Sequence, residues 1–306
     1  MADNYWIDRE RKHIEQSIKD DKEKFKLIRR NYNRAFSEID KEIQAFYQRY
    51  ATKEGITMAE AVKKVSKADV QTFSEKAKRY VKEKNFTPQA NEQLRLYNLT
   101  MKINRLEMLK ANIGLELTSM ANDEFFSMRT VLEQKTYDEL ERQAGILGES
   151  VAFDKKVVDN IVNASFQNAT FSQRIWANQD VLKSEIDKLL TRGMIQGKNP
   201  KVLARDVRKQ FDVTRYQSER LMITELARVQ TSAQETAFKE YGYKEYEYIA
   251  EPTACDICKP LDGKIFKVKD MQAGVNSSPM HPNCLCSTAA HFNREAWDED
   301  LKARGL

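Results

Sequence analysis

The sequence contains few of the residues that interrupt helices. Its 306 residues include only 10 glycines and 6 prolines, while 32% are charged and the mean hydropathy is −0.69. A compact α/β enzyme normally has more turn residues and fewer charges, so this balance indicates long solvated helices. No stretch of about 20 apolar residues occurs, so we expect no part of the chain to span a membrane.

Cysteine is absent from most of the chain, and the four cysteines that exist follow one spacing near its end. Cys255 and Cys258 form a Cys-x-x-Cys pair, and Cys284 and Cys286 form a second pair, preceded by His281. A tight turn lets the two thiolates of the first pair reach one point in space, and the second pair completes a tetrahedral set. This pattern predicts a structural zinc site bound by the four sulfurs.

Other uses of the cysteines fit the sequence less well. The first ten residues contain no apolar signal core, so we expect no passage through an oxidising compartment and hence no disulfides. Thioredoxin-like proteins place Cys-x-x-Cys inside a βαβ unit, and the residues around Cys255 do not alternate that way. Because His281 stands beside Pro282, it is an alternative ligand, a partner of a ligand, or a turn residue with no such role.

Hydrophobic periodicity predicts two long helices in the first half of the chain. Apolar residues recur at steps of three, four and seven from Ile7 to Tyr50, which indicates one amphipathic helix. A second long helix is predicted from Pro88 to Gly145. Each has a narrow apolar seam of the width found in coiled coils, so each needs a partner. We expect the two to pack antiparallel, joined through two short helices.

The predicted domains follow from these patterns. We expect a long-helix N-terminal domain at 1–150, forming an elongated helical hairpin or bundle. A smaller α+β domain follows at 151–292, closed by a zinc knuckle at 243–290, and a tail follows at 293–306. Helix starts are predicted at capping residues such as Ser66, Asn199 and Thr214.

Charge is distributed unevenly along the second half. Ten Lys and Arg against five Asp and Glu lie between Lys183 and Arg220, an excess equal to the net charge of +5 of the whole chain. Lys201, Arg205 and Arg208 share one face of a predicted helix, where they either contact nucleic-acid phosphates or form a solvated face.

Thr224-Glu225 is the one pair with possible acid–base chemistry. Glu225 and Arg228 are three residues apart on a predicted helix, which favours a structural ion pair over acid–base chemistry.

Several motifs together resemble a known family. They are Gly193-Met-Ile, Ile223-Thr-Glu225 with Ala227-Arg228, Cys255-x-x-Cys258, Leu261-Asp-Gly263 and His281-Pro-x-Cys284-x-Cys286. In this order and spacing, the region from Trp176 to Ala290 resembles the phage Mu F-like head morphogenesis domain of tailed-phage minor head proteins. Leu285 replaces an arginine that is usual in the family, and Tyr248 stands where an aromatic residue, often Trp, is found.

The resemblance implies a function for the whole chain. The protein would be a low-copy minor head (minor capsid) protein of the virion, assembled in the host cytoplasm and located inside the capsid near the portal. Its partners would be the portal, other head proteins and packaged double-stranded DNA. The residues themselves show no catalytic constellation, so we expect no enzyme activity.

Two alternatives are weighed against the head role. One is a nucleic-acid-binding module that uses the basic region 183–220. The other is a metal-dependent nuclease with His281 as base and acidic ligands such as Asp256 and Asp262.

Overall fold

The structure is a computed structural model of the 306-residue chain. It describes residues 3–50, 58–61, 63–83, 86–100, 104–147 and 154–292. The predicted tail at 293–306 lies outside the described residues.

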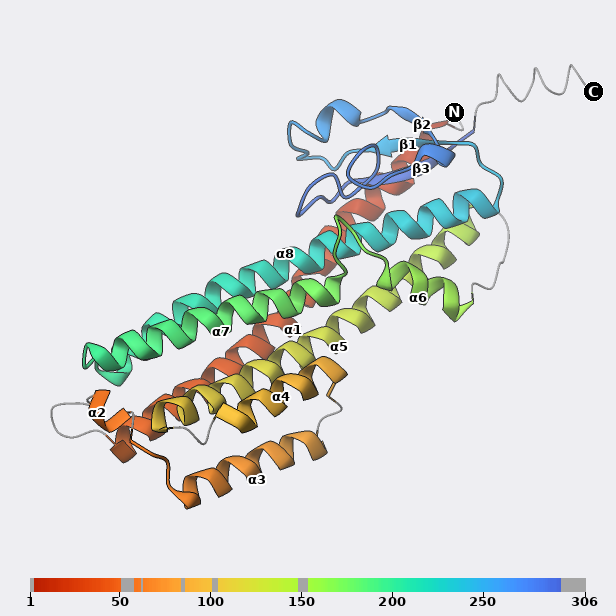
Figure 1. The fold of residues 1–306 in the computed structure, drawn as a ribbon. Coiled ribbons are helices and arrows are strands. Elements are labelled where there is room, and N and C mark those ends of the chain that lie inside the picture. The colour runs from red at the N-terminus through yellow and green to blue at the C-terminus, as the bar shows by residue number, and fades with distance from the viewer. Residues whose placement is uncertain are drawn as a thin grey trace, which may run out of the picture. The chain divides into compact units, whose positions relative to one another are not determined.

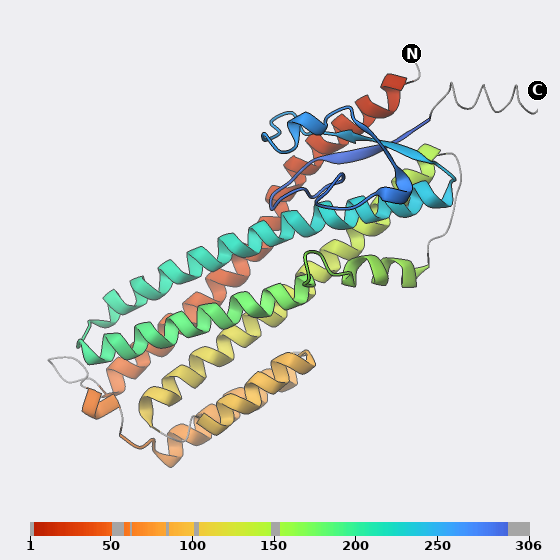
Figure 2. The same cartoon turned by 45° about the horizontal axis from the view of Figure 1, so that its top comes forward.

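The described residues form eight α-helices and a small sheet (Figures 1 and 2). The helices are α1 Asp3–Tyr50, α2 Met58–Ala61, α3 Lys67–Glu83, α4 Pro88–Thr100, α5 Arg105–Leu147, α6 Lys155–Asn163, α7 Phe171–Ile195 and α8 Pro200–Glu240. The strands are β1 Glu245–Ile249, β2 Ile265–Lys267 and β3 Ser287–His291. The predicted fold class, mainly helical with a small α+β region near the cysteines, is confirmed. Every described helix of bilayer-spanning length is too polar to cross a membrane.

Capping residues begin several helices where the sequence predicts them. The Ser66 hydroxyl accepts a hydrogen bond from the backbone N–H of Asp69 at 3.1 Å, and it donates one to the Asp69 carboxylate at 2.8 Å. At the start of α8, the Asn199 side chain accepts from the N–H of Lys201 at 2.9 Å. These bonds satisfy N–H groups that have no partner within the helix, so they fix where each helix begins.

Two helix boundaries differ from the prediction. The single helix expected from Pro88 to Gly145 is wrong: the structure has α4 and α5, and the Asn104 side chain caps α5 by accepting from the N–H of Glu107 at 3.0 Å. The helix start expected at Thr214 is also wrong, because α8 is continuous through it. The Thr214 hydroxyl donates to the carbonyl of Gln210 at 3.1 Å, one turn earlier, so it bonds within the helix and does not cap a new one.

The chain folds into two compact units that take residues from separate stretches. The sheet unit comprises Met1–Phe25, Met128–Phe171 and Arg220–Leu306, and the helical unit comprises Lys26–Ser127 and Ser172–Glu219. Helices α1, α5 and α8 each contribute residues to both units. The domain division near residue 150 stays a prediction, and each compact unit contains residues from both sides of that position.

Within the helical unit, α1 and α5 pack antiparallel, as expected for the two long helices. The Asn31 side chain donates to the carbonyl of Met120 at 2.9 Å. One turn further along α5, a ring of three buried polar side chains joins three helices: Tyr32 of α1, Glu124 of α5 and Ser218 of α8. Apolar side chains buried in this unit include Ile39, Ile43, Ile113, Leu117, Leu203, Val207 and Phe211.

Within the sheet unit, three antiparallel strands lie in the order β2-β1-β3. Tyr246 of β1 pairs with Phe266 of β2 and Ala290 of β3, and Tyr248 pairs with Thr288. Residues two apart on a strand share a face, so Tyr246 and Tyr248 point the same way, and both are fully buried. The first packs on the end of α8 and the second on the cysteines, so β1 links the helix to the cysteine cluster.

A buried polar network holds the first turns of α1 in the sheet unit. The Glu10 carboxylate lies 2.7 Å from the Arg142 guanidinium and accepts a hydrogen bond from the Ser287 hydroxyl at 2.6 Å. Gln234 of α8 donates to the same hydroxyl at 2.9 Å. A buried carboxylate needs such partners to remain charged, so the network fixes α1, α5, α8 and β3 together directly after Cys286.

Candidate metal centre

The candidate ligands come from two loops that flank the sheet. Cys255 and Cys258 lie in the turn after β1, where the N–H of Cys258 bonds to the carbonyl of Cys255 at 3.1 Å. His281, Cys284 and Cys286 lie in the segment that leads into β3. Pairing of β1 with β3 brings the two loops side by side, so residues 26 apart in the sequence meet.

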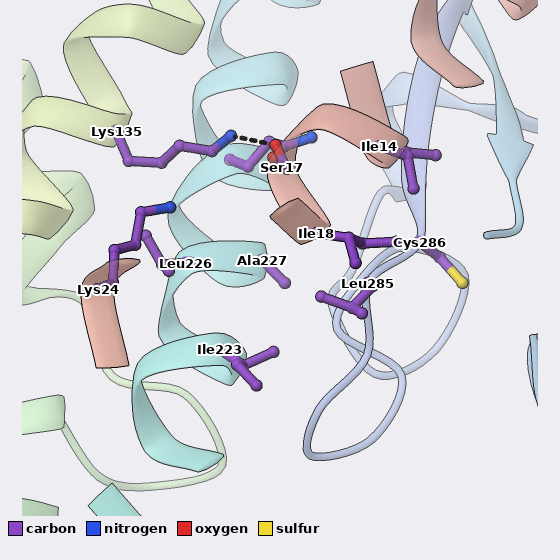
Figure 3. A pocket seen from close by; sticks show the side chains of 11 residues that line it. Ile14, Ser17, Ile18, Lys24, Lys135, Ile223, Leu226, Ala227, Leu285 and Cys286 are labelled. Carbon is purple, nitrogen blue, oxygen red and sulfur yellow. Dashed lines mark hydrogen bonds between the residues drawn. The ribbon is translucent and has the colours of Figure 1, made fainter. Parts of the chain in front are cut away.

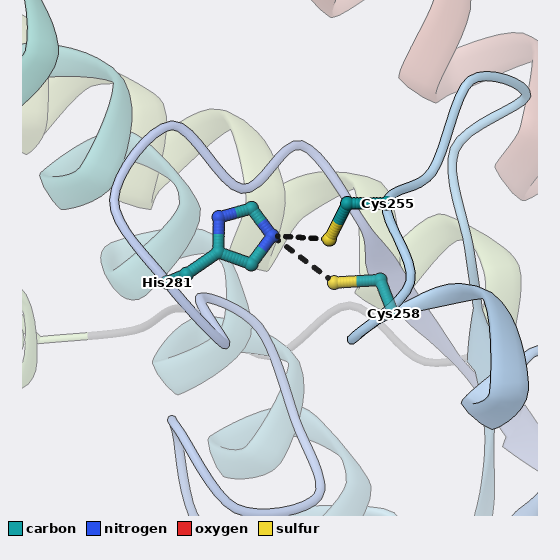
Figure 4. Close-up of side chains that lie close together, drawn as sticks. All are labelled: Cys255, Cys258 and His281. Carbon is teal, nitrogen blue, oxygen red and sulfur yellow. Dashed lines mark hydrogen bonds between the residues drawn. The ribbon is translucent and has the colours of Figure 1, made fainter.

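All five predicted donors gather in this place. His281 Nε2 lies 3.1 Å from the Cys255 sulfur and 3.3 Å from the Cys258 sulfur, and the ring points directly at both (Figure 4). The Cys258 sulfur lies 3.8 Å from that of Cys284. The donors form two overlapping triads, Cys255–Cys258–His281 and Cys258–Cys284–Cys286, which share Cys258.

The geometry fits a tetrahedral zinc ion. With Zn–S bonds of about 2.3 Å, two sulfurs of a tetrahedral site are about 3.8 Å apart. The separation of Cys258 and Cys284 equals this edge. Cys258 belongs to the four-sulfur set predicted from the sequence. It also belongs to each set in which His281 replaces the sulfur of Cys255, Cys284 or Cys286. Each of these sets would leave no coordination position for water, so the zinc would stabilise the fold rather than catalyse a reaction.

Hydrogen bonds favour the charged form of two of the thiols. The pKa of Cys284 is lowered to about 4, chiefly by a hydrogen bond from Cys286 and also by one from the Ser278 hydroxyl. Backbone N–H groups of Cys258 and Ile257 lower the pKa of Cys255. Burial acts in the opposite direction on Cys258 and raises its pKa to about 12. Thiolates are the form that binds metal, and a dication would favour that form for all of them.

Tyr248 packs against the sulfurs from β1. Its ring belongs to the same buried cluster as Cys258, Cys284 and Cys286. Its hydroxyl is buried and has no hydrogen-bond partner that meets geometric criteria in the described part of the chain. A buried hydroxyl normally finds an acceptor, and metal-bound thiolates beside it would supply one. The donor set and this orphaned hydroxyl together fit a metal-bound state.

A threonine on α8 positions the loop that bears His281 and Cys284. The backbone N–H of Asn283 donates to the Thr224 hydroxyl at 3.2 Å, and that hydroxyl donates in turn to the carbonyl of Arg220 at 2.8 Å. Asn283 has φ of +64°, in the left-handed region that Asn tolerates better than most residues. Thr224 therefore fixes a tight turn between the two candidate ligands.

We expect Thr224→Val to weaken metal binding by about tenfold, because loss of a group that orients ligands typically costs 10–100-fold in metal affinity. The measurement is zinc affinity by competition with a chelator. Thr236→Val is the matched control, since the Thr236 hydroxyl makes the same bond to a carbonyl one turn earlier, that of Ser232 at 2.8 Å, and hydrogen-bonds to no described residue of the metal loop. Equal affinities in the two variants would remove the positioning role.

The structure shows where the predicted ion pair lies. Arg228 Nε donates to the Glu225 carboxylate at 2.7 Å, and both side chains are buried. The remaining guanidinium nitrogens donate to the carbonyls of Ile161 and Val162 at 2.7 and 3.0 Å. These carbonyls belong to the last turn of α6, where carbonyls lack the N–H partner four residues on that they have within a helix, so Arg228 attaches α6 to α8.

Leu285 occupies the position at which the phage Mu F-like family usually has arginine. In the structure Leu285 lies in an apolar environment. It lines a small cavity with Ile14, Ile18 and Ile223, beside Lys135 and Lys24 (Figure 3). The cavity measures about 30 Å³, enough for a single water molecule. An apolar side chain suits this wall, since α1 presents isoleucines to it. The substitution leaves the neighbouring ligands in place.

The basic residues predicted to contact DNA belong to the helical unit, whereas the cysteines belong to the sheet unit. Lys201 and Arg205 are exposed in the helical unit. Arg208 donates to the Asn33 side chain at 2.9 Å and lies over the ring of Phe36, 4.8 Å from its centre. The Arg208 guanidinium is therefore engaged with α1 of the helical unit.

The acidic residues of the nuclease alternative do not join the candidate ligands. The Asp262 carboxylate accepts from the N–H of Ala250 at 2.8 Å, and Asp256 is exposed. Among the described residues, neither belongs to a group that could hold a metal.

Comparison with known proteins gives one match. Residues 184–289 match the model of the family described as phage Mu protein F like protein. No curated protein and no solved structure matches the chain significantly. The matched range begins in α7, ends in β3 and contains Thr224, the Glu225–Arg228 pair and all five candidate ligands. The match bears out the resemblance predicted from the sequence, and residues 184–289 of this chain are similar to the phage Mu protein F-like family.

Proposed function

We propose that this protein is a minor head protein of a tailed phage, which acts in head assembly near the portal and is carried inside the capsid. The observation that supports this most is the family match over residues 184–289, which contains the whole metal-ligand pattern. A structural zinc closed by Cys258 and its neighbours would keep the sheet unit folded while it meets partner proteins. This role requires no catalytic group.

Partner proteins are the portal and other head proteins. Exposed large apolar side chains that lie in the helical unit, such as Val181 and Ile195 on α7 and Tyr216 on α8, are candidates for such contacts. Exposed apolar groups of this size are common at protein interfaces. The association with packaged DNA is part of the same proposal.

The test is the composition of purified heads made with and without the gene. We expect mass spectrometry to find the protein in the heads at far lower copy than the major capsid protein. We also expect omission of the gene to lower the yield of DNA-filled heads. Absence of the protein from heads, together with a normal yield without it, would contradict the head role whatever the metal content of the protein.

A further inference from the structure

A basic hollow lies in the sheet unit where α8 passes into the sheet. Its volume is about 420 Å³, and four lysines line it: Lys239, Lys244, Lys267 and Lys269. Tyr243 and the buried Val268 form its apolar part, and Glu245 is the one acidic residue in its lining. Local sequence patterns do not reveal it, because the four lysines lie in α8, in the turn before β1, in β2 and in the turn after β2.

The backbone fixes the spacing of these lysines. Gly242, with φ of +77°, turns the chain out of α8 toward β1. The N–H of Val268 then bonds to the carbonyl of Lys244 at 2.9 Å, and Lys267 pairs with Glu245 across the two strands. Lys244, which precedes Glu245, and Lys269, which follows Lys267, are thereby held at the same end of this antiparallel pair. The positive charges are thus gathered by the sheet register and not by a flexible loop.

Three of these ammonium groups have no partner among the described residues. The side chains of Lys244, Lys267 and Lys269 form no hydrogen bond or ion pair there and these residues are exposed, whereas the Lys239 ammonium pairs with Glu235. Glu240 and Asp270 are adjacent in sequence but do not line the hollow. Free ammonium groups around a concave surface attract anions, and such a surface focuses the field.

We propose that this hollow binds the phosphates of a nucleic-acid backbone. Lysine acts as a point charge with rotatable donors, which suits phosphate oxygens and does not suit the reading of base edges. Neighbouring phosphates of one strand are a few ångströms apart, so a polymer can meet several lysines at once, and the binding is sequence-independent and sensitive to salt. This inference rests on the DNA contact included in the proposed function, and it places that contact on the sheet unit.

The experiment compares two triple variants of the full metal-loaded chain. One is K244A/K267A/K269A. The other, K201A/R205A/K209A, removes the same charge from exposed positions of α8 and includes Lys201 and Arg205 of the basic face predicted from the sequence. Binding to a fluorescent 30-base-pair duplex is measured by anisotropy from about 50 to 200 mM salt.

We expect the hollow variant to reduce the slope of log affinity against log salt by about 2.7, at about 0.9 for each lost phosphate contact. The slope of the α8 variant should stay that of the unaltered protein. The reverse pattern, or equal slopes, would overturn the assignment to the hollow while leaving the DNA contact in place. If the unaltered protein does not bind the duplex, both this inference and the DNA contact fail, and the head role is still decided by the composition of purified heads.

A small-anion site is distinguished in the same titration. Inorganic phosphate at a few millimolar, compared with chloride at matched ionic strength, should displace the duplex no more than chloride does. Stronger displacement by phosphate would show a site for a single small ion and would overturn the assignment to a polymer.

Discussion

Cys258→Ser is expected to lower the zinc content from about one equivalent to less than a tenth and to unfold the cysteine module. Cys258 belongs to both ligand triads, so its loss leaves neither triad complete. Zinc binding contributes roughly 10–16 kcal/mol to the folding of zinc-finger peptides, more than the stability of most small modules. The measurements are elemental analysis and hydrogen exchange of residues 243–290.

The matched control is Ile257→Ser, which introduces the same side chain next to Cys258 at an exposed position. It should keep the metal. We expect α3 and α4, which lie in the helical unit, to retain their protection in both variants. Zinc below a tenth of an equivalent in the unaltered, metal-replete protein would remove the zinc proposal. A comparison of the zinc affinities of His281→Ala and Cys286→Ser identifies the fourth ligand, because the variant that lacks the true ligand binds zinc more weakly.

Glu124→Gln is expected to stabilise the helical unit at pH 8 and to leave its stability near pH 4.5 almost unchanged. In the buried ring, the Tyr32 hydroxyl donates to one Glu124 oxygen at 3.0 Å and lies 2.7 Å from the Ser218 hydroxyl, which hydrogen-bonds to the other Glu124 oxygen. Three hydrogen bonds need three protons. The two hydroxyls carry only two, so the ring closes when the carboxyl carries the third, with Glu124 donating to the Ser218 hydroxyl and that hydroxyl donating to Tyr32.

Burial supports the same protonation state. It raises the pKa of Glu124 to about 7, and no cation offsets it. Nearby arginines on α1 are paired with other carboxylates: Arg29 with Glu219, and Arg34 with Asp123. The folded state therefore holds a proton that the unfolded chain releases near pH 4.5. Stability from this group is fully present below that pH and is lost as pH rises through about 7.

The size of the effect follows from the shift. A difference of about 2.5 pKa units corresponds to roughly 3 kcal/mol, which is the largest gain expected from Gln at pH 8. The amide supplies the third proton at every pH. Urea unfolding is followed by the fluorescence of Trp176, which is buried in this unit, in a background with Trp6 and Trp297 changed to Phe.

Asp123→Asn is the control for this comparison, because it removes a neighbouring carboxylate on the same helix that pairs with Arg34 outside the ring. This variant should show the same pH dependence of the unfolding free energy as the unaltered protein. Other buried acids such as Glu10 contribute equally to the unfolding free energy of the Glu124 variant and of the unaltered protein, so their contributions cancel in the difference between the two. Identical slopes between pH 5 and 8 would show that Glu124 is ionised in the folded protein.

Local patterns in the sequence predict most of the helices and the ligands. Ser66 and Asn199 act through bonds to residues two or three positions away, so their effect can be derived without the fold. The short spacing within each cysteine pair likewise predicts that its two sulfurs lie close together, without knowledge of the fold. Thr214 misleads because threonine can cap a helix or bond inside one, and the packing of α8 decides which.

Features made by distant residues could not be predicted in this way. The Tyr32–Glu124–Ser218 ring joins residues that are 92 and 94 positions apart in the sequence. The sequence around Glu124 does not distinguish it from the acidic residues that are exposed. Thr224 is 59 positions from Asn283, so its hold on the ligand loop appears only in the fold. Resemblance to the family pointed to Thr224 and Glu225 without giving a reason for them.

The contact between Glu10 and Ser287 has a consequence for the time course of synthesis. The two residues are 277 positions apart, so at 5–20 residues per second roughly 15 to 55 seconds pass between their translation. During that interval the first turns of α1 carry a carboxylate whose later partners on α8 and β3 do not yet exist. The start of the chain therefore reaches its final surroundings only when the last strand has left the ribosome, so a chain that stops early leaves both of its ends unfinished.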